Sequence, residues 1–270
     1  MRSGSGAVWT LTVIPLLTCR SGFVAVPESV VLARCHVFGS DQSSFPCYLA
    51  LRQMRIIRAQ QLEQGTALFD EIIDVLHNDG LVCFPGRRQY SIAASLMSSD
   101  AVIALVQSKR RSGKAPSLVL IPDLSHLPSV VDEIPVEAEA LARTFWPGPL
   151  TIVLRPNSDL PARVRKTIAG KPARIGVRLP DSGFQQELVC RFASPLLVSS
   201  ANISQRSGAG SASNVRKHFN HTIDLMIDAG DIPDTIPSTV VDLTGTAPVI
   251  TREGLISAAS VQEVLAGASI

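Results

Sequence analysis

Apolar side chains recur every three to four positions across residues 66–77, and the tripeptide NDG that follows is typical of a helix end. Short apolar runs alternate with further helical patterns from there to the C-terminus. We expect strands at residues 81–85, 118–121, 150–154, 175–179, 195–198, 223–227, 239–243 and 248–251. We expect helices at residues 66–77, at 100–108 with Asp100 as the cap, at 136–144, after Asp181, at 213–219, and behind a capping box at 260–263.

Helices that alternate with strands predict an α/β fold, with a mixed sheet and flanking helices in a single domain of residues 54–270. The sheet should be mixed because some strands lie too close in sequence for a helical crossover. Residues 1–53 show no clear period. We expect them to form an N-terminal extension that is either disordered or lies upstream of a true start at Met54. The apolar stretch at 7–17 loosely resembles a secretory signal, but Pro15 interrupts it.

The composition is that of a globular protein, since 46% of the 270 residues are hydrophobic. The chain has 25 basic and 23 acidic residues, and this net charge of +2 does not demand a polyanionic partner. The five cysteines lack zinc or disulfide spacing, so we expect buried free thiols and a cytoplasmic location. No apolar run approaches the roughly 20 residues that span a bilayer as a helix, so we expect no membrane partner.

Four small or polar residues, Ser199-Ser200-Ala201-Asn202, directly follow the apolar run at 195–198. In an open α/β sheet, ligands bind beyond the carboxyl ends of the strands. The segment therefore predicts a ligand-binding loop, although a strand-end turn capped by Ser and Asn is the alternative interpretation.

A basic patch at residues 109–114 follows the helix predicted at 100–108. A solvated loop is the ordinary interpretation of such a patch. Polar groups also stand at other strand ends, namely Ser238 with Thr239, and Arg252. Together these groups predict a site for a triphosphate, because phosphate oxygens need fixed donors and charge neutralisation.

Five segments occur in an order that resembles the YrdC-like threonylcarbamoyl-AMP synthase family: FWPGPLT (145–151), GVRLP (176–180), SSAN (199–202), PSTVVD (237–242) and REG (252–254). By itself, FWPGPLT has a structural interpretation, as a rigid turn built on two prolines and a glycine. Members of the family use ATP, bicarbonate and L-threonine to form threonylcarbamoyl-AMP and pyrophosphate, a step towards threonylcarbamoyl modification of an adenosine in certain tRNAs. The resemblance further implies magnesium bound with the ATP. It also implies an open, twisted sheet whose positively charged concave face is associated with double-stranded RNA.

The resemblance implies roles for single residues on the nucleotide side. Lys109 and Arg111 match the K-x-R element, which makes them the expected catalytic cations and ATP ligands. Ser200 and Asn202 match the S-x-N element, and Arg252 matches a late arginine of the family. All five are expected to bind ATP.

Other residues are expected on the amino-acid side. Arg178 matches an arginine that helps to hold the amino acid, as a guanidinium fork can hold a carboxylate. Ser200, Ser238 and Arg88 are expected to bind the substrate with it.

The departures from the family fall mainly on this amino-acid side. Where the family has P-T-[DE]-T-V-Y-G-L, residues 85–92 read PGRRQYSI and keep only the proline and the tyrosine. Arg174 stands in place of a threonine of many members, and Leu120 in place of a histidine of some. Arg87 and Arg88 in the pocket would disfavour a substrate ammonium and favour an anion. The alternative is that both arginines point to solvent.

Two functions follow from these patterns. The first is an ATP-dependent nucleotidyltransferase that forms threonylcarbamoyl-AMP or a related carbamoyl-adenylate from ATP, bicarbonate and an amino acid, with tRNA or double-stranded RNA as a further partner. The second is a non-catalytic paralogue that binds nucleotide or double-stranded RNA through a basic face. The retained nucleotide motifs favour the first. We expect ATP binding without threonine binding if the arginine loop lines the pocket.

Overall fold

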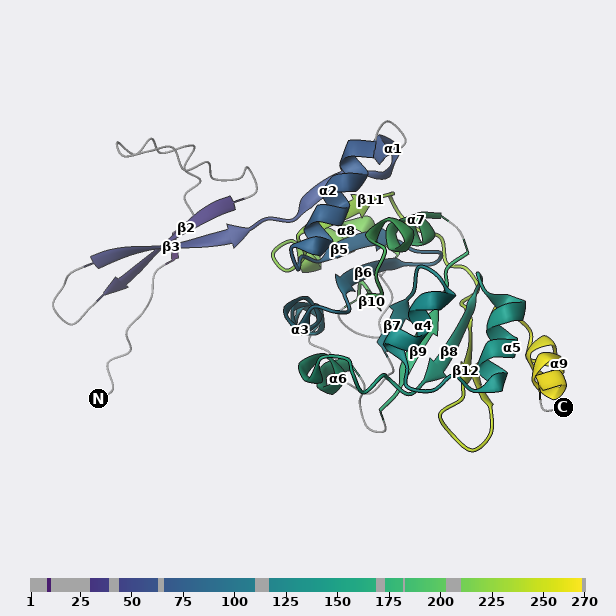
Figure 1. Cartoon of the computed structure of the whole chain (residues 1–270). Coiled ribbons are helices and arrows are strands. Elements are labelled where there is room, and N and C mark those ends of the chain that lie inside the picture. The colour runs from purple at the N-terminus through teal and green to yellow at the C-terminus, as the bar shows by residue number, and fades with distance from the viewer. Residues whose placement is uncertain are drawn as a thin grey trace, which may run out of the picture.

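The computed structural model describes residues 9–10, 30–38, 44–62, 66–109, 117–168, 173–181, 183–202 and 210–268, with side chains described only from residue 53 onward. Within these residues a ten-stranded mixed sheet carries helices on both faces (Figure 1). The predicted fold class, an open mixed α/β sheet with flanking helices, is confirmed.

The strand order along the sheet is β13-β12-β8-β9-β7-β10-β6-β5-β11-β4. In that order the strands are Val249–Arg252, Thr239–Asp242, Leu150–Leu154, Ile175–Arg178, Ser117–Leu120, Leu196–Ser200, Tyr90–Ser95, Val82–Pro85, Leu225–Asp228 and Arg55–Arg58. The pairs β4/β11, β11/β5, β7/β9 and β8/β12 are parallel, and the other five neighbouring pairs are antiparallel. The short connection between β5 and β6 is one of those that make the sheet mixed, because it can join only antiparallel neighbours.

The α-helices of the described residues are α1 to α9: Ala59–Leu62, Thr66–His77, Ser99–Ser108, Leu127–Val130, Val136–Phe145, Ala162–Ile168, Gly183–Phe192, Ala212–Phe219 and Ala258–Ala268. A 3-10 turn at Leu124–His126 leads into α4. The sequence pattern predicts α2, α3, α5, α7, α8 and α9. It misses α6 and the short helices α1 and α4, as well as strands β4 and β6 of the large sheet.

Two helix starts differ from the prediction. Ser98 caps α3 instead of Asp100, because its extended backbone lets its hydroxyl accept a hydrogen bond from the Ala101 N–H at 3.1 Å. At the C-terminus, the Ser260 N–H donates to the hydroxyl of Ser257 at 3.1 Å, so the predicted capping box at 260–263 is wrong. In both cases the first turn of the helix contains a residue type that often caps helices, and the prediction chose it instead of the serine that lies just before the helix.

Side chains alternate across each strand and so divide the core into two layers. One layer packs under α3, α5, α6, α8 and α9, and it takes Leu150, Ile152 and Leu154 from β8. The opposite layer packs under α2 and α7, over strands β4 to β7, β10 and β11. Among the described residues, no buried side chain of β8, β9 or β12 belongs to this second layer. One face of these three strands is therefore left for a cleft.

Residues before β4 form a separate three-stranded antiparallel sheet of β1 (Trp9–Thr10), β2 (Val30–Phe38) and β3 (Ser44–Arg52). The large sheet begins at β4, close to the predicted boundary. The nature of residues 1–53 as an extension stays a prediction.

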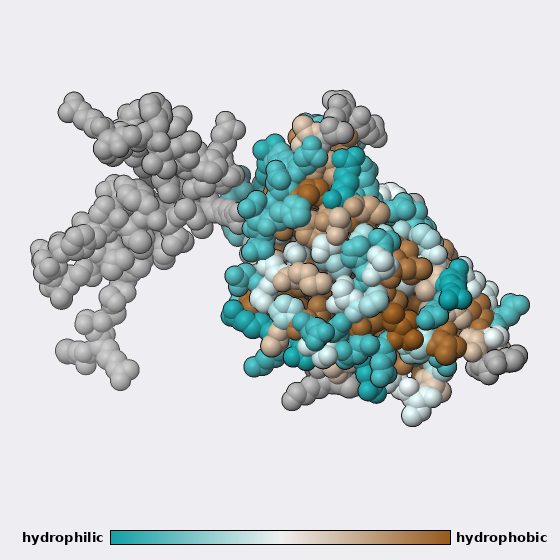
Figure 2. All heavy atoms as spheres, in the orientation of Figure 1, coloured by the Kyte–Doolittle hydropathy of each residue, from teal (hydrophilic) through white to brown (hydrophobic). Residues whose placement is uncertain are grey.

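The visible surface mixes polar and apolar side chains, and hydrophobic residues gather where Figure 1 places α4 and α5 (Figure 2). Leu124 and Val136 are among the exposed large hydrophobic residues. Within the described part of the chain, every helix is too short or too polar to cross a membrane.

Candidate functional site

The open face of β8, β9 and β12 forms the floor of a cleft of about 1160 Å³. On β8, Thr151 and Val153 line it, while Gly176 and Arg178 do so on β9. A Cβ atom on Gly176 would lie 2.8 Å from Thr151 Cγ2. Glycine at this position therefore keeps the floor open beside Thr151.

Lys109 is the C-cap of α3, and only 8% of its surface is exposed. Its Nζ atom donates hydrogen bonds to Ser199 Oγ at 2.9 Å and to Asn202 Oδ1 at 3.1 Å, as well as to the carbonyl oxygen of Ser200. Ser200 Oγ in turn donates to Asn202 Oδ1 at 2.8 Å. The predicted strand-end loop and the first residue of the basic patch thus meet in the cleft. For Lys109 the solvated-loop interpretation is wrong.

Arg111, the second expected cation of the K-x-R element, lies outside the described residues, as does the rest of the basic patch. Its roles in catalysis and ATP binding stay predictions.

Arg252 lines the cleft at the end of β13 and contacts Ser238, the residue before β12. The Arg252 Nε donates to the Ser238 carbonyl oxygen at 3.0 Å, and Nη2 donates to its hydroxyl at 3.1 Å. The same hydroxyl lies 3.3 Å from Thr151 Oγ1. Burial lowers the pKa of the Arg252 guanidinium, and the nearby charge of Arg88 adds to this effect. Ser238 and Arg252 therefore form one polar unit at the cleft wall.

Thr239 shares the expected Ser238-Thr239 motif but is fully buried and does not line the cleft. Its hydroxyl donates to the Ile256 carbonyl oxygen at 2.6 Å and accepts from the N–H groups of Gly254 and Ile256. Thr239 thus fastens the turn that follows Arg252. Its contribution to the site is structural.

Arg178 projects from the end of β9 into the cleft. Its Nη2 donates to Gln185 Oε1 at 2.9 Å, and its buried Nε has no hydrogen-bond partner among the described residues. The pKa of Arg178 is lowered to about 10, mainly by burial; Asp181 opposes this shift, while Arg87 and Arg252 add to it. A guanidinium that is crowded by like charges and only partly hydrogen-bonded favours an incoming anion.

Arg87 and Arg88 both line the cleft, and each pairs with a carboxylate from another loop. Arg87 Nη2 contacts Asp181 Oδ2 at 2.7 Å, while Arg88 contacts Asp234 Oδ1 through Nε at 3.0 Å and Nη2 at 2.7 Å. The loop between β5 and β6 therefore bridges two other loops at the cleft rim. Both arginines line the cleft, but their side chains are 47% and 39% exposed and each has a counter-ion.

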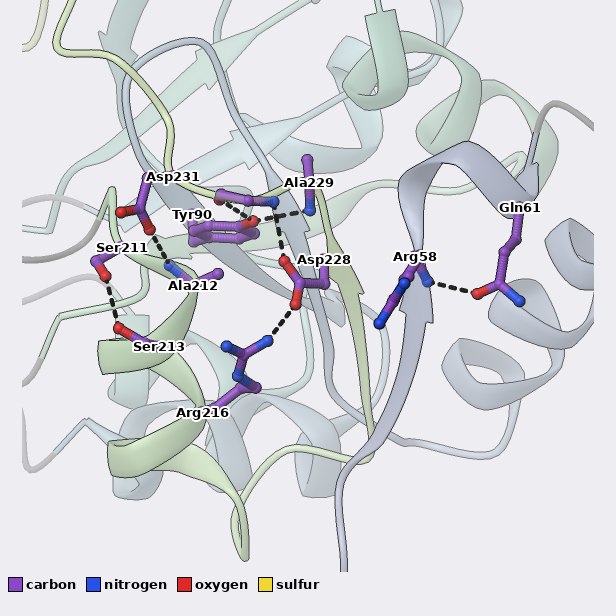
Figure 3. Close-up of polar contacts among 11 residues, drawn as sticks. Arg58, Gln61, Tyr90, Ser211, Ala212, Ser213, Arg216, Asp228, Ala229 and Asp231 are labelled. Atoms are coloured by element: carbon purple, nitrogen blue, oxygen red, sulfur yellow. Dashed lines mark hydrogen bonds and ion pairs between the residues drawn. The ribbon is translucent and has the colours of Figure 1, made fainter.

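Tyr90, which the chain shares with the family, holds one of these loops (Figure 3). Its hydroxyl donates to the Gly230 carbonyl oxygen at 2.7 Å and accepts from the Ala229 N–H at 2.9 Å. Asp228 Oδ1 accepts from the Gly230 N–H at 2.9 Å, and Asp228 Oδ2 pairs with Arg216. The segment that leads to Asp234 is thereby tied to the start of β6 and the end of β11.

Arg174 also lines the cleft, where its Nη1 contacts Asp242 Oδ2 at 2.9 Å. Burial raises the pKa of Asp242, but hydrogen bonds from Thr244 and Arg174 outweigh it and hold the pKa below its ordinary value. Leu120, in contrast, is fully buried in the core and does not line the cleft. Arg174 is therefore a cleft cation, whereas Leu120 only fills space.

The sequence interpretation missed several cleft residues. In FWPGPLT, Trp146 has the expected structural role, since it is buried and its Nε1 donates to the Leu150 carbonyl oxygen at 2.8 Å. However, Gly148, Pro149 and Thr151 of the same segment line the cleft. Gln89, Asp181 and Gln185 also line it. Thr151 is a polar residue between apolar residues of β8, so it faces away from the core. Such a position within a strand is the one signal in the sequence that could have identified a cleft residue of this kind.

Comparison with known proteins decides the family. The family model Sua5_yciO_yrdC, described as "Telomere recombination", matches residues 74–254. The chain belongs to the Sua5/YciO/YrdC family. The suspected YrdC-like resemblance is thereby confirmed.

Several relatives of this chain are named after an enzymatic activity, threonylcarbamoyl-AMP synthase. Threonylcarbamoyl-AMP synthase of Pyrococcus abyssi is 35% identical over 185 residues, which are 68% of this chain and 53% of that protein. The protein of the same name from Serratia proteamaculans is 30% identical over 186 residues, covering 67% of this chain and 95% of the relative. The chain thus spans about half of the archaeal relative and nearly all of the bacterial one.

A solved structure of the family matches as well. It is that of P. abyssi Sua5 complexed with L-threonine, with a TM-score of 0.65, 29% identity and coverage of 78% of this chain and 60% of the other. The fold of this chain is therefore that of the Sua5/YciO/YrdC family.

Proposed function

We propose that this protein is an ATP-dependent carbamoyl-adenylate synthase. It would join an amino acid and bicarbonate to AMP and release pyrophosphate, as the name threonylcarbamoyl-AMP synthase of its relatives implies for them. The observation that carries the proposal is the convergence on one cleft of Lys109 with its Ser200 and Asn202 contacts, of the Ser238–Arg252 unit, and of Arg178.

The nucleotide half of the cleft would be built on Lys109, Ser200, Asn202 and Arg252. Lys109 is held by oxygen atoms of the 199–202 loop, so its ammonium is fixed in position before a ligand arrives. A preorganised cation stabilises charge that develops on a phosphoryl group without a cost of reorganisation. We assign Lys109 this catalytic role, together with Arg111.

The amino-acid half would be built on Arg178, with Ser238, Ser200 and Arg88 nearby in the cleft lining. Arg178 would take the α-carboxylate of the acceptor, because a guanidinium fork matches the two oxygens of a carboxylate. Gln185 orients this fork through its hydrogen bond to Nη2.

The chemistry needs no protein nucleophile. The acceptor amine forms a C–N bond with bicarbonate and water leaves, which yields a carbamate. A carbamate oxygen then attacks the α-phosphorus of ATP, and the bond to the β-phosphate oxygen breaks to release pyrophosphate. The protein's part is to hold the reactants together and to neutralise the developing charge.

Magnesium would accompany the ATP. The described residues contain no cluster of three or more His, Cys, Asp or Glu side chains that could hold a metal ion. The two carboxylates of the cleft lining, Asp181 and Asp242, contact arginines. We therefore propose that phosphate oxygens and water supply most of the magnesium ligands.

The direct test is release of pyrophosphate from ATP by the purified full chain, with bicarbonate and each of a panel of amino acids. We expect release that depends on both bicarbonate and the amino acid, and an adenylate product whose mass includes that amino acid. Absence of bicarbonate-dependent release with every amino acid would contradict the proposal. Salt-dependent binding of double-stranded RNA in such a protein would then favour the non-catalytic alternative.

A further inference from the structure

The proposed amino-acid half of the cleft contains Arg87 in addition to Arg178. A site for an acceptor with a neutral side chain does not need this second arginine. We propose that Arg87 binds a second carboxylate on the acceptor, so that the preferred amino acid is a dicarboxylic one, aspartate or glutamate, instead of threonine. This inference rests on the proposed function, since it concerns the substrate class of the same cleft.

The first support is the position of Arg87 relative to Arg178. Both side chains line the cleft, and the charge of Arg87 adds to the burial that lowers the pKa of Arg178. Arg178 is sufficient for one carboxylate. With an acceptor whose side chain is neutral, Asp181 is the only counter-ion of Arg87 among the described residues. A second carboxylate on the acceptor would give Arg87 a further counter-ion.

The second support is that the contact between Arg87 and Asp181 can be exchanged. The side chains are 47% and 31% exposed, and ion pairs of this kind contribute little to stability. Within the described residues, Nη2 is the one guanidinium nitrogen of Arg87 with a partner. The rest of the fork can accept a carboxylate while Asp181 stays in place or moves aside.

The third support is the contrast with Arg88. Arg88 uses both Nε and Nη2 on Asp234, so it fastens the loop more than it offers donors to a ligand. The backbone of Arg87 is also held in place, because the Thr235 hydroxyl donates to the Arg87 carbonyl oxygen at 3.2 Å. A Cβ on Gly86 would come within 2.7 Å of the Gln89 carbonyl oxygen, so this tight turn favours glycine. The loop therefore presents Arg87 from a fixed base.

The experiment separates acceptor choice from catalysis. Calorimetric titration of the full chain, saturated with a non-hydrolysable ATP analogue, measures the affinities for aspartate, glutamate and threonine. We expect one of the dicarboxylic amino acids to bind at least about tenfold more tightly than threonine. Arg87→Ala should abolish this preference and Arg87→Lys should restore part of it. The matched control Arg143→Ala, which removes an exposed arginine paired with Glu139 on α5, should keep it.

Each possible outcome supports or overturns the inference about the acceptor. Threonine binding as tightly as aspartate and glutamate, a preference that survives Arg87→Ala, or no binding of any amino acid overturns the inference. Preferential binding of aspartate or glutamate without pyrophosphate release supports the acceptor assignment and contradicts the adenylation reaction. Pyrophosphate release with threonine but not with aspartate or glutamate keeps the proposed function and overturns this inference.

Discussion

The Nζ atom of Lys109 donates a hydrogen bond to Asn202 Oδ1 over 3.1 Å and so joins the end of α3 to the loop after β10. The two residues are 93 positions apart. The sheet brings them together, because β6 pairs antiparallel with β10 and α3 follows β6. The start of β6 therefore lies beside the end of β10, and a helix that runs back from the end of β6 reaches the same edge.

Replacing Lys109 should remove catalysis more than folding. We expect Lys109→Gln to lower bicarbonate-dependent pyrophosphate release by about 10²-fold, since loss of one preorganised donor to developing charge has an effect of this order. The measurement is the initial rate at saturating ATP and amino acid. Lys166→Gln, on the exposed face of α6, should leave the rate unchanged. Equal rates of the Lys109 variant and the native protein would remove Lys109 from the site.

Arg178→Lys tests the carboxylate fork. Lysine keeps the charge but cannot form two parallel hydrogen bonds, so we expect KM for the amino acid to rise by about tenfold, with a much smaller change in KM for ATP. The exposed Arg163→Lys serves as the control. A rise in KM for ATP alone would instead place Arg178 on the nucleotide.

Much of this site was predictable because its parts stand at the ends of local patterns. Ser200 and Asn202 follow an apolar strand, and Arg178 ends another. The ion pairs of the rim were not predictable. Arg87 and Asp181 are 94 positions apart, and local sequence does not show which loops the strand order brings together.

Strand β6 was missed for a different reason. All six of its residues, YSIAAS, are buried, so neither the two-residue alternation of a half-exposed strand nor a strongly apolar run is present. Four of its six residues are Ser or Ala, and the strand lies between β5 and β10 at the centre of the sheet. Consequently the loop at 85–90 could be compared with the family motif, but its partners could not be named.

Asp242 should make the free energy of unfolding depend on pH in the acidic range. Its carboxylate accepts hydrogen bonds from Thr244 and pairs with Arg174, and its pKa is lowered from the ordinary 3.8. A lowered pKa in the folded state stabilises the protein above the ordinary value, and this contribution is lost as the pH falls through the folded-state pKa.

We therefore expect Asp242→Asn to reduce the free energy of unfolding at pH 7 by about 1–3 kcal/mol, the usual cost of leaving such partners unsatisfied. The difference from the native protein should shrink as the pH falls below 3.8. Urea unfolding at a series of pH values measures it. A difference that does not change with pH would show that the carboxylate charge contributes nothing there.

Tyr90→Phe tests the anchor of the 228–234 segment. The substitution leaves the Gly230 carbonyl oxygen and the Ala229 N–H without the hydroxyl that now joins them. We expect the free energy of unfolding at pH 7 to fall by about 1–3 kcal/mol, because each backbone group loses a partner.

The same variant gives a signature in alkali. Burial raises the pKa of Tyr90 from 10.0 to about 12, so between these values the unfolded chain loses the phenolic proton while the folded chain retains it. Native stability must therefore fall as the pH rises through this window, whereas Tyr90→Phe has no such proton to lose. The difference in unfolding free energy between the two proteins should narrow from pH 10 to 12. A constant difference would mean that the Tyr90 hydroxyl titrates as it does in the unfolded chain, in conflict with its buried place under the loop that carries Asp234.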